Sequence, residues 1–456
     1  MITPDMCIQP CRQLCRLILA LCLVNILTPH AAGTGRTPGL DAAGAPTPPP
    51  QARETATSPR TPRIPTYKKL TLSREFLAEG SHYGDFNRDG HMDVVAGPYW
   101  YEGPDFVKRH EIYPPKAFDP EQYSDNFLTF GIDINGDGWT DVFVCPQPGT
   151  RGYWFENPKG GNGHWKKHFF PNEISNESQW WVEIIKGAGK CLLYNRDGFL
   201  GFSTLKVENN IPKWTFHAIS KEDRRRFERY THGIGCGDIN GNGRVDIVEK
   251  EGWWEQPENP GETPWKFHKF KFAMAGAQMF VFDVDGDGLN DVVTAWHCHL
   301  YGLIWWKQIR GADGRISWVK NEILPIKPDL ESPALRISQM HSMDIADING
   351  DGLPDIVTGK RFWAHGPTGD REAYAPAVLY WFELRRDGKG GAEFIPHKID
   401  DDSGVGTQVT TVDLNGDGVP DIISSNKKGT FIFLSQPPEK PESQGTEKAS
   451  ASPPRP

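Results

Sequence analysis

The sequence predicts an all-β protein made of radially repeated four-stranded units, and three observations carry this prediction. A nine-residue motif with oxygen-bearing side chains at fixed positions occurs six times. Most copies are followed by an aromatic segment and then by a segment containing Trp or His. Between residues 66 and 436, short runs of β-branched and aromatic residues alternate with Gly, Pro and Asn, and no long helical periodicity is present.

The repeated motif is typical of a calcium-binding loop. It begins and ends with Asp, and has Asp or Asn at positions 3 and 5 and Gly at position 6. Ca²⁺ takes roughly six to eight oxygen ligands, and the glycine permits the sharp turn that wraps a loop around the ion. Only one copy has the Glu at position 12 that an EF-hand requires, Glu249, so the Asp at position 9 is expected to close the cage. The alternative is a set of Asp/Asn/Gly turns without metal, but turns alone do not require Asp at both ends.

We name each loop by its first residue and expect up to six Ca²⁺ ions, one in each loop. The expected ligands are Asp85, Asn87, Asp89 and Asp93; Asp133, Asn135, Asp137 and Asp141; Asp238, Asn240, Asn242 and Asp246; Asp283, Asp285, Asp287 and Asp291; Asp347, Asn349, Asp351 and Asp355; and Asp413, Asn415, Asp417 and Asp421.

Each unit is interpreted as four strands, in which strand A leads into the Asp loop, B follows it, C is the aromatic segment and D carries the Trp or His pattern. Successive loops begin 48, 105, 45, 64 and 66 residues apart. The interval of 105 residues fits two units and contains the strand-like segment 180–205 without an Asp loop. The sequence therefore predicts a seven-bladed β-propeller with four-stranded blades. Residues 67–72 resemble a lone strand D, so the N-terminal strand should complete the last blade and close the ring.

These Asp-loop units resemble the FG-GAP/VCBS repeat family, whose seven-bladed propellers occur in integrin α subunits and in many exported bacterial proteins. The resemblance covers about residues 67–436 and implies that the ions bind in the A-to-B turns on one face. The Asp238 loop departs from the pattern by having Asn at both positions 3 and 5, hence less negative charge. The resemblance does not imply an activity, because the scaffold hosts unrelated functions.

The segments outside the repeats predict export. Arg12 and Arg16 precede an apolar run, residues 17–27, and a small-residue cleavage site follows, so residues 1–32 are interpreted as a signal peptide. Residues 33–65 and 437–456 are poor in large apolar side chains and are expected to be a disordered linker and tail around a propeller at 66–436. We expect a secreted, periplasmic or cell-surface monomer without a membrane span in its mature form.

Composition limits the partners. A formal net charge of −9 argues against a nucleic-acid partner, and 18 of the 59 acidic residues lie in the six loops. Cys145, Cys191, Cys236 and Cys298 are widely separated and are expected to be free thiols.

A second candidate site lies on the face opposite the Asp loops, where the D-to-A and B-to-C turns must meet. His232 and His341 each stand six residues before the first Asp of their loops and should lie at the mouth of the central channel. His82 lies near the same place in the first blade, and His297 and Lys360 follow B strands. These five are the candidate catalytic residues, and the histidines are suited to ligating one transition metal or to acid–base chemistry. The alternative is that each is a hydrogen-bonded turn or core residue. The strand D histidines share a repeat position and are interpreted as structural: His168, His217, His268 and His397.

Three functions remain open. The first is an exported calcium-binding propeller that recognises a saccharide or protein ligand on the face opposite the calcium loops. The second is a metal-assisted lyase or dehydratase acting on an oxidised sugar, because propellers with these repeats resemble the first domain of aldos-2-ulose dehydratase. The third is a structural role at the cell envelope. No nucleophile motif, phosphate loop or dinucleotide fingerprint is present. Convergence of His82, His232, His297 and His341 would favour the enzyme.

Overall fold

The computed structural model describes residues 63–436. Within that range it contains 28 strands and one short helix, α1 (Gly366–Gly369), so the predicted all-β class is confirmed. No helix in this range is long and apolar enough to cross a membrane. The predicted signal peptide, the tail and the linker as far as residue 62 lie outside the described residues.

The strands form five four-stranded sheets and one eight-stranded sheet. In chain order the four-strand units are β2 (Ser81–Gly84), β3 (Asp93–Ala96), β4 (Tyr99–Tyr101) and β5 (Arg109–Glu111); β6 (Leu128–Ile132), β7 (Asp141–Cys145), β8 (Thr150–Glu156) and β9 (Lys166–Ile174); β10 (Trp180–Val182), β11 (Cys191–Arg196), β12 (Phe199–Glu208) and β13 (Ile211–Ala218); β14 (Ile234–Gly237), β15 (Asp246–Glu249), β16 (Gly252–Glu255) and β17 (Lys266–Lys269); β18 (Gln278–Phe282), β19 (Asp291–Ala295), β20 (Leu303–Arg310) and β21 (Ile316–Leu324); β22 (Met343–Ala346), β23 (Asp355–Gly359), β24 (Leu379–Arg386) and β25 (Ala392–Asp400); and β26 (Val409–Val412), β27 (Asp421–Asn426), β28 (Gly429–Gln436) and β1 (Thr66–Ser73).

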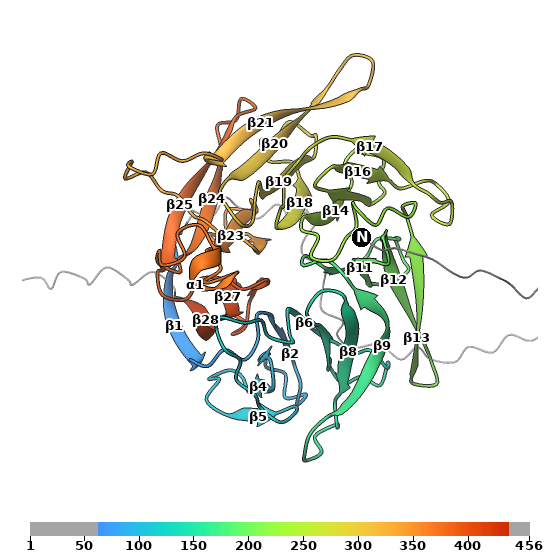
Figure 1. The fold of residues 1–456 in the computed structure, drawn as a ribbon, viewed down its shortest axis with the longest axis vertical. Helices are drawn as coiled ribbons and strands as arrows, with labels where there is room; N and C mark the ends of the chain where they lie inside the picture. The colour runs from blue at the N-terminus through green and yellow to red at the C-terminus, as the bar shows by residue number, and fades with distance from the viewer. Residues whose placement is uncertain (1–62, 437–456) are drawn as a thin grey trace, which may run out of the picture. The chain divides into compact units, whose positions relative to one another are not determined.

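The sheets stand side by side around a common centre (Figure 1), with the first strand of each unit innermost. Neighbours within each unit pair antiparallel, whereas the inner strands β14 and β18 pair in parallel and so join two units into the eight-stranded sheet. The inner strands β2, β6, β18, β22 and β26 also contact their neighbours. This arrangement is a β-propeller.

The N-terminal strand closes the ring, as predicted. β1 pairs antiparallel with β28, from Thr66 opposite Gln436 to Ser73 opposite Thr430. It lies on the outer side of a sheet whose other three strands come from the end of the described chain, so it covers an edge that would otherwise expose unpaired backbone groups. Lys69 on β1 also forms an ion pair of 2.7 Å with Asp400 of the preceding unit.

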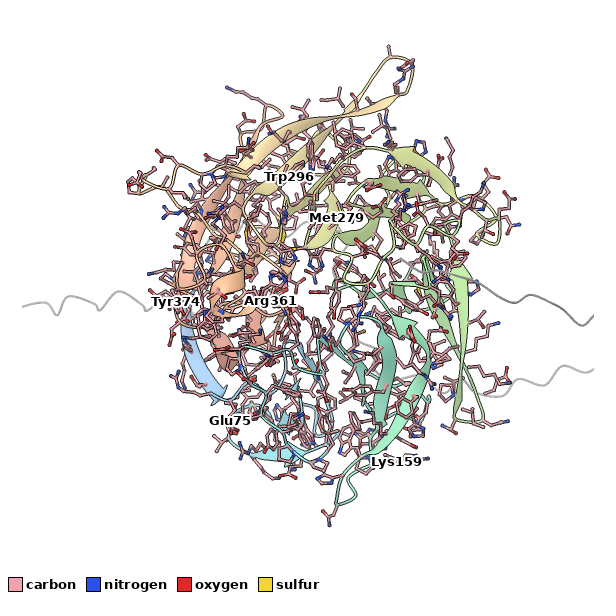
Figure 2. The ribbon with its side chains drawn as sticks, in the orientation of Figure 1. Glu75, Lys159, Met279, Trp296, Arg361 and Tyr374 are labelled. Carbon is pink, nitrogen blue, oxygen red and sulfur yellow. The ribbon has the colours of Figure 1, made fainter. Side chains whose placement is uncertain are left out.

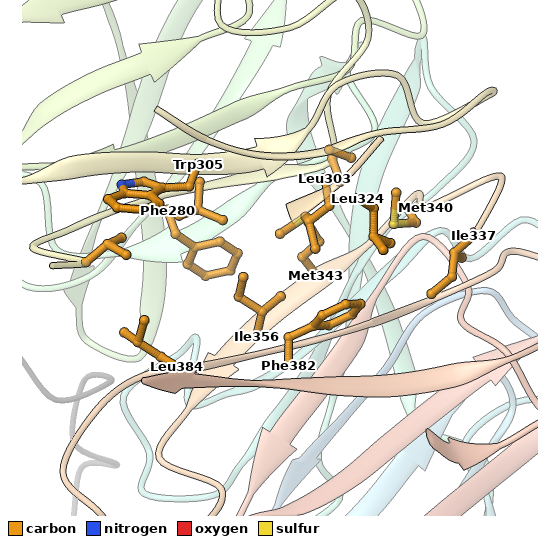
Figure 3. Close-up of a cluster of buried hydrophobic side chains, with 14 residues drawn as sticks. Phe280, Leu303, Trp305, Leu324, Ile337, Met340, Met343, Ile356, Phe382 and Leu384 are labelled. Atoms are coloured by element: carbon orange, nitrogen blue, oxygen red, sulfur yellow. The ribbon is translucent and has the colours of Figure 1, made fainter. Parts of the chain in front are cut away.

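Hydrophobic side chains fill the space between neighbouring units. Figure 3 shows one such cluster, in which Phe280, Trp305 and Leu303 of one unit pack against Ile356, Phe382 and Leu384 of the next. Because every sheet packs on both faces, aromatic and branched residues dominate the strands. The four cysteines in the described part of the chain are free.

Strand D histidines are structural parts of this packing. In four units the imidazole stacks on a Trp of strand C, with ring centroids 3.9–4.3 Å apart, and its Nε2 lies 2.8–2.9 Å from a Glu two residues after that Trp. The four sets are Trp100, His110 and Glu102; Trp154, His168 and Glu156; Trp253, His268 and Glu255; and Trp381, His397 and Glu383. The unit without an Asp loop differs, since His217 stacks on Phe202 and contacts Thr204.

Each Asp loop is fixed by the buried carboxylate at position 9. In all six, Oδ2 accepts a hydrogen bond of 2.8–3.2 Å from the backbone N–H of loop position 2. Oδ1 accepts one of 2.7–2.9 Å from a backbone N–H near the end of strand C. The six residues, all with no exposed surface, are Asp93, Asp141, Asp246, Asp291, Asp355 and Asp421. One side chain therefore ties the A-to-B turn to strand C in every unit that has the motif.

Replacing Asp141 by Ala should lower the free energy of unfolding by about 2–6 kcal/mol, because two buried backbone N–H groups, those of Ile134 and Asn157, lose their acceptor. The measurement is urea unfolding in EDTA, where bound ions make no contribution. Asp313→Ala, at an exposed turn, is the matched control and should change the free energy little. A loss below about 0.5 kcal/mol in Asp141→Ala would contradict this role of the carboxylate.

Candidate functional site

Three histidines and one cysteine converge on the face opposite the Asp loops. His232 precedes β14, His341 precedes β22, and Cys298 and His299 lie in the turn after β19. The Nε2 atoms of His232 and His299 are 2.8 Å apart, and the ring centroid of His341 lies 4.6 Å from that of His299. One potential ligand atom from each of the four residues lies within 4.8 Å of the others.

Local structure explains why these residues meet. His232 and His341 each stand two residues before an inner strand, so their shared register places both at the start of strand A. Their two units are not neighbours, because the unit of β18–β21 stands between them. That middle unit contributes His299, whose backbone N–H donates to Nδ1 of His297 at 3.2 Å within the turn.

The imidazoles are held neutral and several of their nitrogens have no protein partner. Nδ1 of His341 lies 3.1 Å from the backbone carbonyl of Gln339, which fixes the tautomer that leaves Nε2 with a free lone pair. That Nε2 and the Nδ1 atoms of His232 and His299 are buried without a hydrogen-bond partner. Burial, assisted by the nearby charge of Arg361, lowers the pKa of His232 to about 3 and that of His341 well below its usual value.

A buried ion-pair network adjoins the cluster. Arg361 is 2% exposed and pairs with Glu79 and, at 3.5 Å, with Glu177. In Figure 2 Arg361 lies on the inner side of the ring of sheets. Oε2 of Glu177 is 4.0 Å from Nε2 of His232, and burial raises the pKa of Glu177 to about 7 even though Arg361 opposes the shift. The network thus links the starts of two units and the insertion of a third to the histidines.

A pocket of about 550 Å³ opens beside His299. Its walls are His297, His299, Leu300, His365, Gly369, Asp370, Arg371 and Glu372. Most of these residues belong to the insertion 361–377 between β23 and β24, which contains α1. Nδ1 of His365 bonds Oδ1 of Asp370 at 2.9 Å, and the His365 ring lies 4.5 Å from that of His299. This pair leaves Nε2 of His365 available for proton transfer beside the cluster.

Buried lysines anchor that insertion. Nζ of Lys360 donates to the carbonyl of Glu372 and to Ser338 Oγ, both at 2.9 Å, and Nζ of Lys427 donates to the carbonyl of Trp363 at 2.8 Å. Burial lowers the pKa of Lys360 and that of Lys427 to about 8 each. Lys360 therefore positions the loop that carries His365 and Asp370.

Four of the ten non-glycine residues with positive φ in residues 63–436 lie around the same place. Tyr230, Gln339, Trp363 and Glu372 adopt positive φ angles of 50–64° although none is glycine. Tyr230 lies two residues before His232 and Gln339 two residues before His341, whereas the other two lie in the insertion. Such conformations persist only where the surrounding structure holds them, and they cluster at functional sites.

The five candidate residues that the sequence indicated on this face lie in different parts of the structure. His232 and His341 belong to the cluster, His297 lines the pocket, and Lys360 anchors the insertion. His82 lies apart from the cluster, inside β2, where it stacks on Tyr83 with Nδ1 3.2 Å from the backbone nitrogen of Gly131. Sequence reasoning did not select Glu177, His299, Arg361, His365 or Asp370 as candidates, although the run from Trp296 to His299 and the insertion 361–377 were signals for four of them.

Hydrogen bonds within each Asp loop hold its side chains in place. In the Asp133 loop, Oδ1 and Oδ2 of Asp133 accept backbone N–H groups of Gly136 and Gly138 at 2.8 and 2.9 Å, and the side chains of Asn135 and Asp137 each accept the N–H two residues later. Four other loops repeat this pattern. The Asp85 loop has Arg88 at position 4, and there Oδ1 of Asp85 accepts the N–H of Asp89 at 3.1 Å. In the Asp283 loop one side-chain oxygen from each of positions 1, 3 and 5 lies within 4.8 Å of the other two, and such a set of oxygens fits a hard cation.

A comparison with known protein families agrees with the repeat. A family model described as an FG-GAP-like repeat matches residues 283–358. A search of curated proteins gave no match.

Similar solved structures share little sequence with this chain. One describes recognition of non-reducing terminal N-acetylglucosamine by an Agrocybe aegerita lectin, with 16% identity over 79% of this chain and 86% of that chain and a TM-score of 0.41. Another is BBS1N in complex with ARL6DN, with 10% identity over 83% and 99% of the two chains and a TM-score of 0.44. A third is the Photorhabdus luminescens Tc holotoxin pore, with 16% identity over 68% of this chain and 14% of that chain and a TM-score of 0.36. At these scores the likeness carries no inference about function.

Substituting Lys360 by Met should loosen the insertion, because two polar groups that hold it lose their ammonium partner. We expect amide hydrogen exchange in residues 362–376 to rise by about tenfold or more, with global unfolding much less affected. Lys389→Met, at an exposed hairpin, is the control. Unchanged exchange in the insertion would contradict the anchoring role.

Proposed function

We propose that this protein is an exported, calcium-stabilised propeller that binds an oxygen-rich ligand of the saccharide class at a transition-metal centre on the face opposite the Asp loops. The observation that carries the proposal is the convergence of His232, His299 and His341, three neutral imidazoles with nitrogens that lack partners. We count seven blades, because the eight-stranded sheet consists of two four-stranded units. The Asp loops would hold Ca²⁺ and stabilise the ring.

The donor set favours a borderline or soft divalent metal over Ca²⁺ or Mg²⁺. Three imidazoles and a thiol are ligands that Zn²⁺ and similar ions prefer, whereas hard cations need oxygens. Burial raises the pKa of the Cys298 thiol well above its usual value, so this group would serve as a fourth ligand only when a metal displaces its proton. Three histidines alone would leave a coordination position for a ligand in the adjoining pocket.

Charge balance indicates the kind of ligand. Glu79, Glu177 and Arg361 together carry one negative charge when both carboxylates are ionised, and the buried histidines are neutral. A divalent ion would make the site net positive by one charge. Such a site favours a ligand that carries, or can develop, one negative charge on oxygen, as hydroxy-carbonyl sugars and sugar acids do. Arg371 and Glu372 on the pocket wall supply further polar contacts for hydroxyl groups.

A second candidate function is a lyase or dehydratase acting on an oxidised sugar, and the His365–Asp370 pair favours it. His365 is oriented by Asp370 and lies beside the histidine cluster, as expected of a base that removes a proton next to a carbonyl. A bound metal ion would supply polarisation of that carbonyl. Glu177 is a second proton acceptor beside His232.

Purified protein should bind one equivalent of Zn²⁺ or Co²⁺, and His341→Ala should weaken this binding by about 100-fold or more, since even outer-shell partners of such ligands are worth 10–100-fold. Metal analysis gives the stoichiometry, and the visible spectrum of the Co²⁺ form reports imidazole coordination. His164→Ala is the control, because His164 is exposed and pairs with Glu111.

Melting temperatures of both variants separate function from structure. A metal site predicts that His341→Ala folds normally and loses the metal. Wild-type protein that binds neither ion, or a His341→Ala variant that binds them as tightly, would overturn the proposed centre.

A further inference from the structure

The Asp283 loop differs from the other five in charge. It alone has Asp at positions 1, 3 and 5, whereas the others have Asn at position 3 and one also has Asn at position 5. One oxygen from each of Asp283, Asp285 and Asp287 lies within 4.8 Å of the other two. The Asp285 side chain has no exposed surface. Three close carboxylates, one of them buried, repel one another strongly unless a cation lies between them.

The chain itself supplies that cation. Nζ of Lys307 on β20 forms ion pairs with Asp285 and, at 3.2 Å, with Oδ2 of Asp287, and it donates to the carbonyl of Gly390 in the next unit at 3.1 Å. Only 20% of the Lys307 side chain is exposed. The neighbouring Arg386 donates to the backbone carbonyl of Val284 at 2.9 Å and covers the same loop. The Lys307 ammonium is thus bound by groups of two neighbouring units.

Lys307 takes the oxygens that an ion would need. Oδ1 of Asp285 and Oδ1 of Asp287 already accept backbone N–H groups within the loop, at 3.3 and 2.9 Å. The Oδ2 atoms are the ones left to face a cation, and both are paired with Lys307. Calcium in the usual position would therefore have to break a largely buried ion pair, which costs several kcal/mol.

A coordinated change of two residues in this unit explains the lysine. Four other units have Glu two residues after the strand C Trp, and this Glu bonds the stacked His of strand D. In this unit Lys307 replaces the Glu, and Asn321 stands opposite Trp305 where the His would be. With no His to bond, the side chain at this position reaches the Asp loop instead.

We propose that the Lys307 ammonium is the built-in cation of the Asp283 loop, so that this loop folds without calcium and takes an ion only when the lysine is displaced. The proposal concerns the calcium part of the proposed function and is independent of the histidine centre. It predicts that the Asp283 loop stays without calcium at concentrations that fill the Asp347 loop, which has the sequence DINGDGLPD and, within residues 63–436, no ion pair to a lysine like that of Lys307.

Lys307→Met tests the proposal in two ways. In EDTA the variant should melt at a clearly lower temperature than wild type, because the three carboxylates lose their cation. Added Ca²⁺ should restore the melting temperature, and calorimetric titration with Ca²⁺ should show one additional tight site. Tb³⁺ emission sensitised by tryptophan should rise as well, since Trp305 Nε1 bonds Oδ2 of Asp291 in this loop at 2.8 Å.

Two control variants make the result interpretable. Lys307→Arg keeps the charge and should resemble wild type. Lys159→Met removes a lysine that pairs with Asp137 but is 53% exposed, and should change neither the stability in EDTA nor the number of sites. The EDTA comparison does not require calcium in any other loop. Equal melting temperatures of Lys307→Met and wild type in EDTA, or an unchanged number of calcium sites, would overturn the proposal.

Discussion

The buried carboxylate at position 9 of each Asp loop holds together the unit that contains it. It has no exposed surface, and it accepts one backbone N–H from the start of the loop and one from the far end of strand C. Burying a carboxylate is costly, and burial raises the pKa of Asp141 to about 8. The two backbone hydrogen bonds offset that cost only when the loop and strand C are in register. This requirement fixes the turn at one end of each unit that has the motif and leaves the turns at the other end free to vary.

That freedom explains why the candidate site lies where it does. The starts of the inner strands contribute Glu79, Glu177, His232 and His341, and one B-to-C turn contributes His299. Residues far apart in the sequence are thus brought together by the ring and not by any local motif. The two faces of the ring also differ in the ligand atoms that they offer to an ion. The Asp loops offer hard oxygen donors, and the histidine cluster on the opposite face offers neutral nitrogen donors. Lys307 pairs with two carboxylates of the most acidic loop, so the chain itself places a cation there.

The fold could be predicted from the sequence because the chain repeats a unit of four strands, and the Asp motif identifies the A-to-B turn in most of these units. Strand alternation also fixed which turns share a face, and the matched register of His232 and His341 placed both at the mouth. The same reasoning selected His82, but this residue lies three positions before Asp85 and not six, so it falls inside β2, and Glu79 takes the place two residues before the strand. Between His297 and His299, only the conformation of the turn decides which ring enters the cluster. The contribution of His365 and Asp370 depends on how the insertion 361–377 folds, and an irregular segment with a positive φ at Trp363 has no periodicity from which to predict it.

Anomalous X-ray diffraction from crystals grown with Ca²⁺ and Zn²⁺ tests the account most directly, because it locates each kind of ion separately. We expect one zinc peak bounded by His232, His299 and His341, and calcium density in Asp loops other than the Asp283 loop, where the Lys307 ammonium stays in contact with Asp285 and Asp287. Zinc found only at surface residues, with the three imidazoles bonded solely to protein or water, would contradict it.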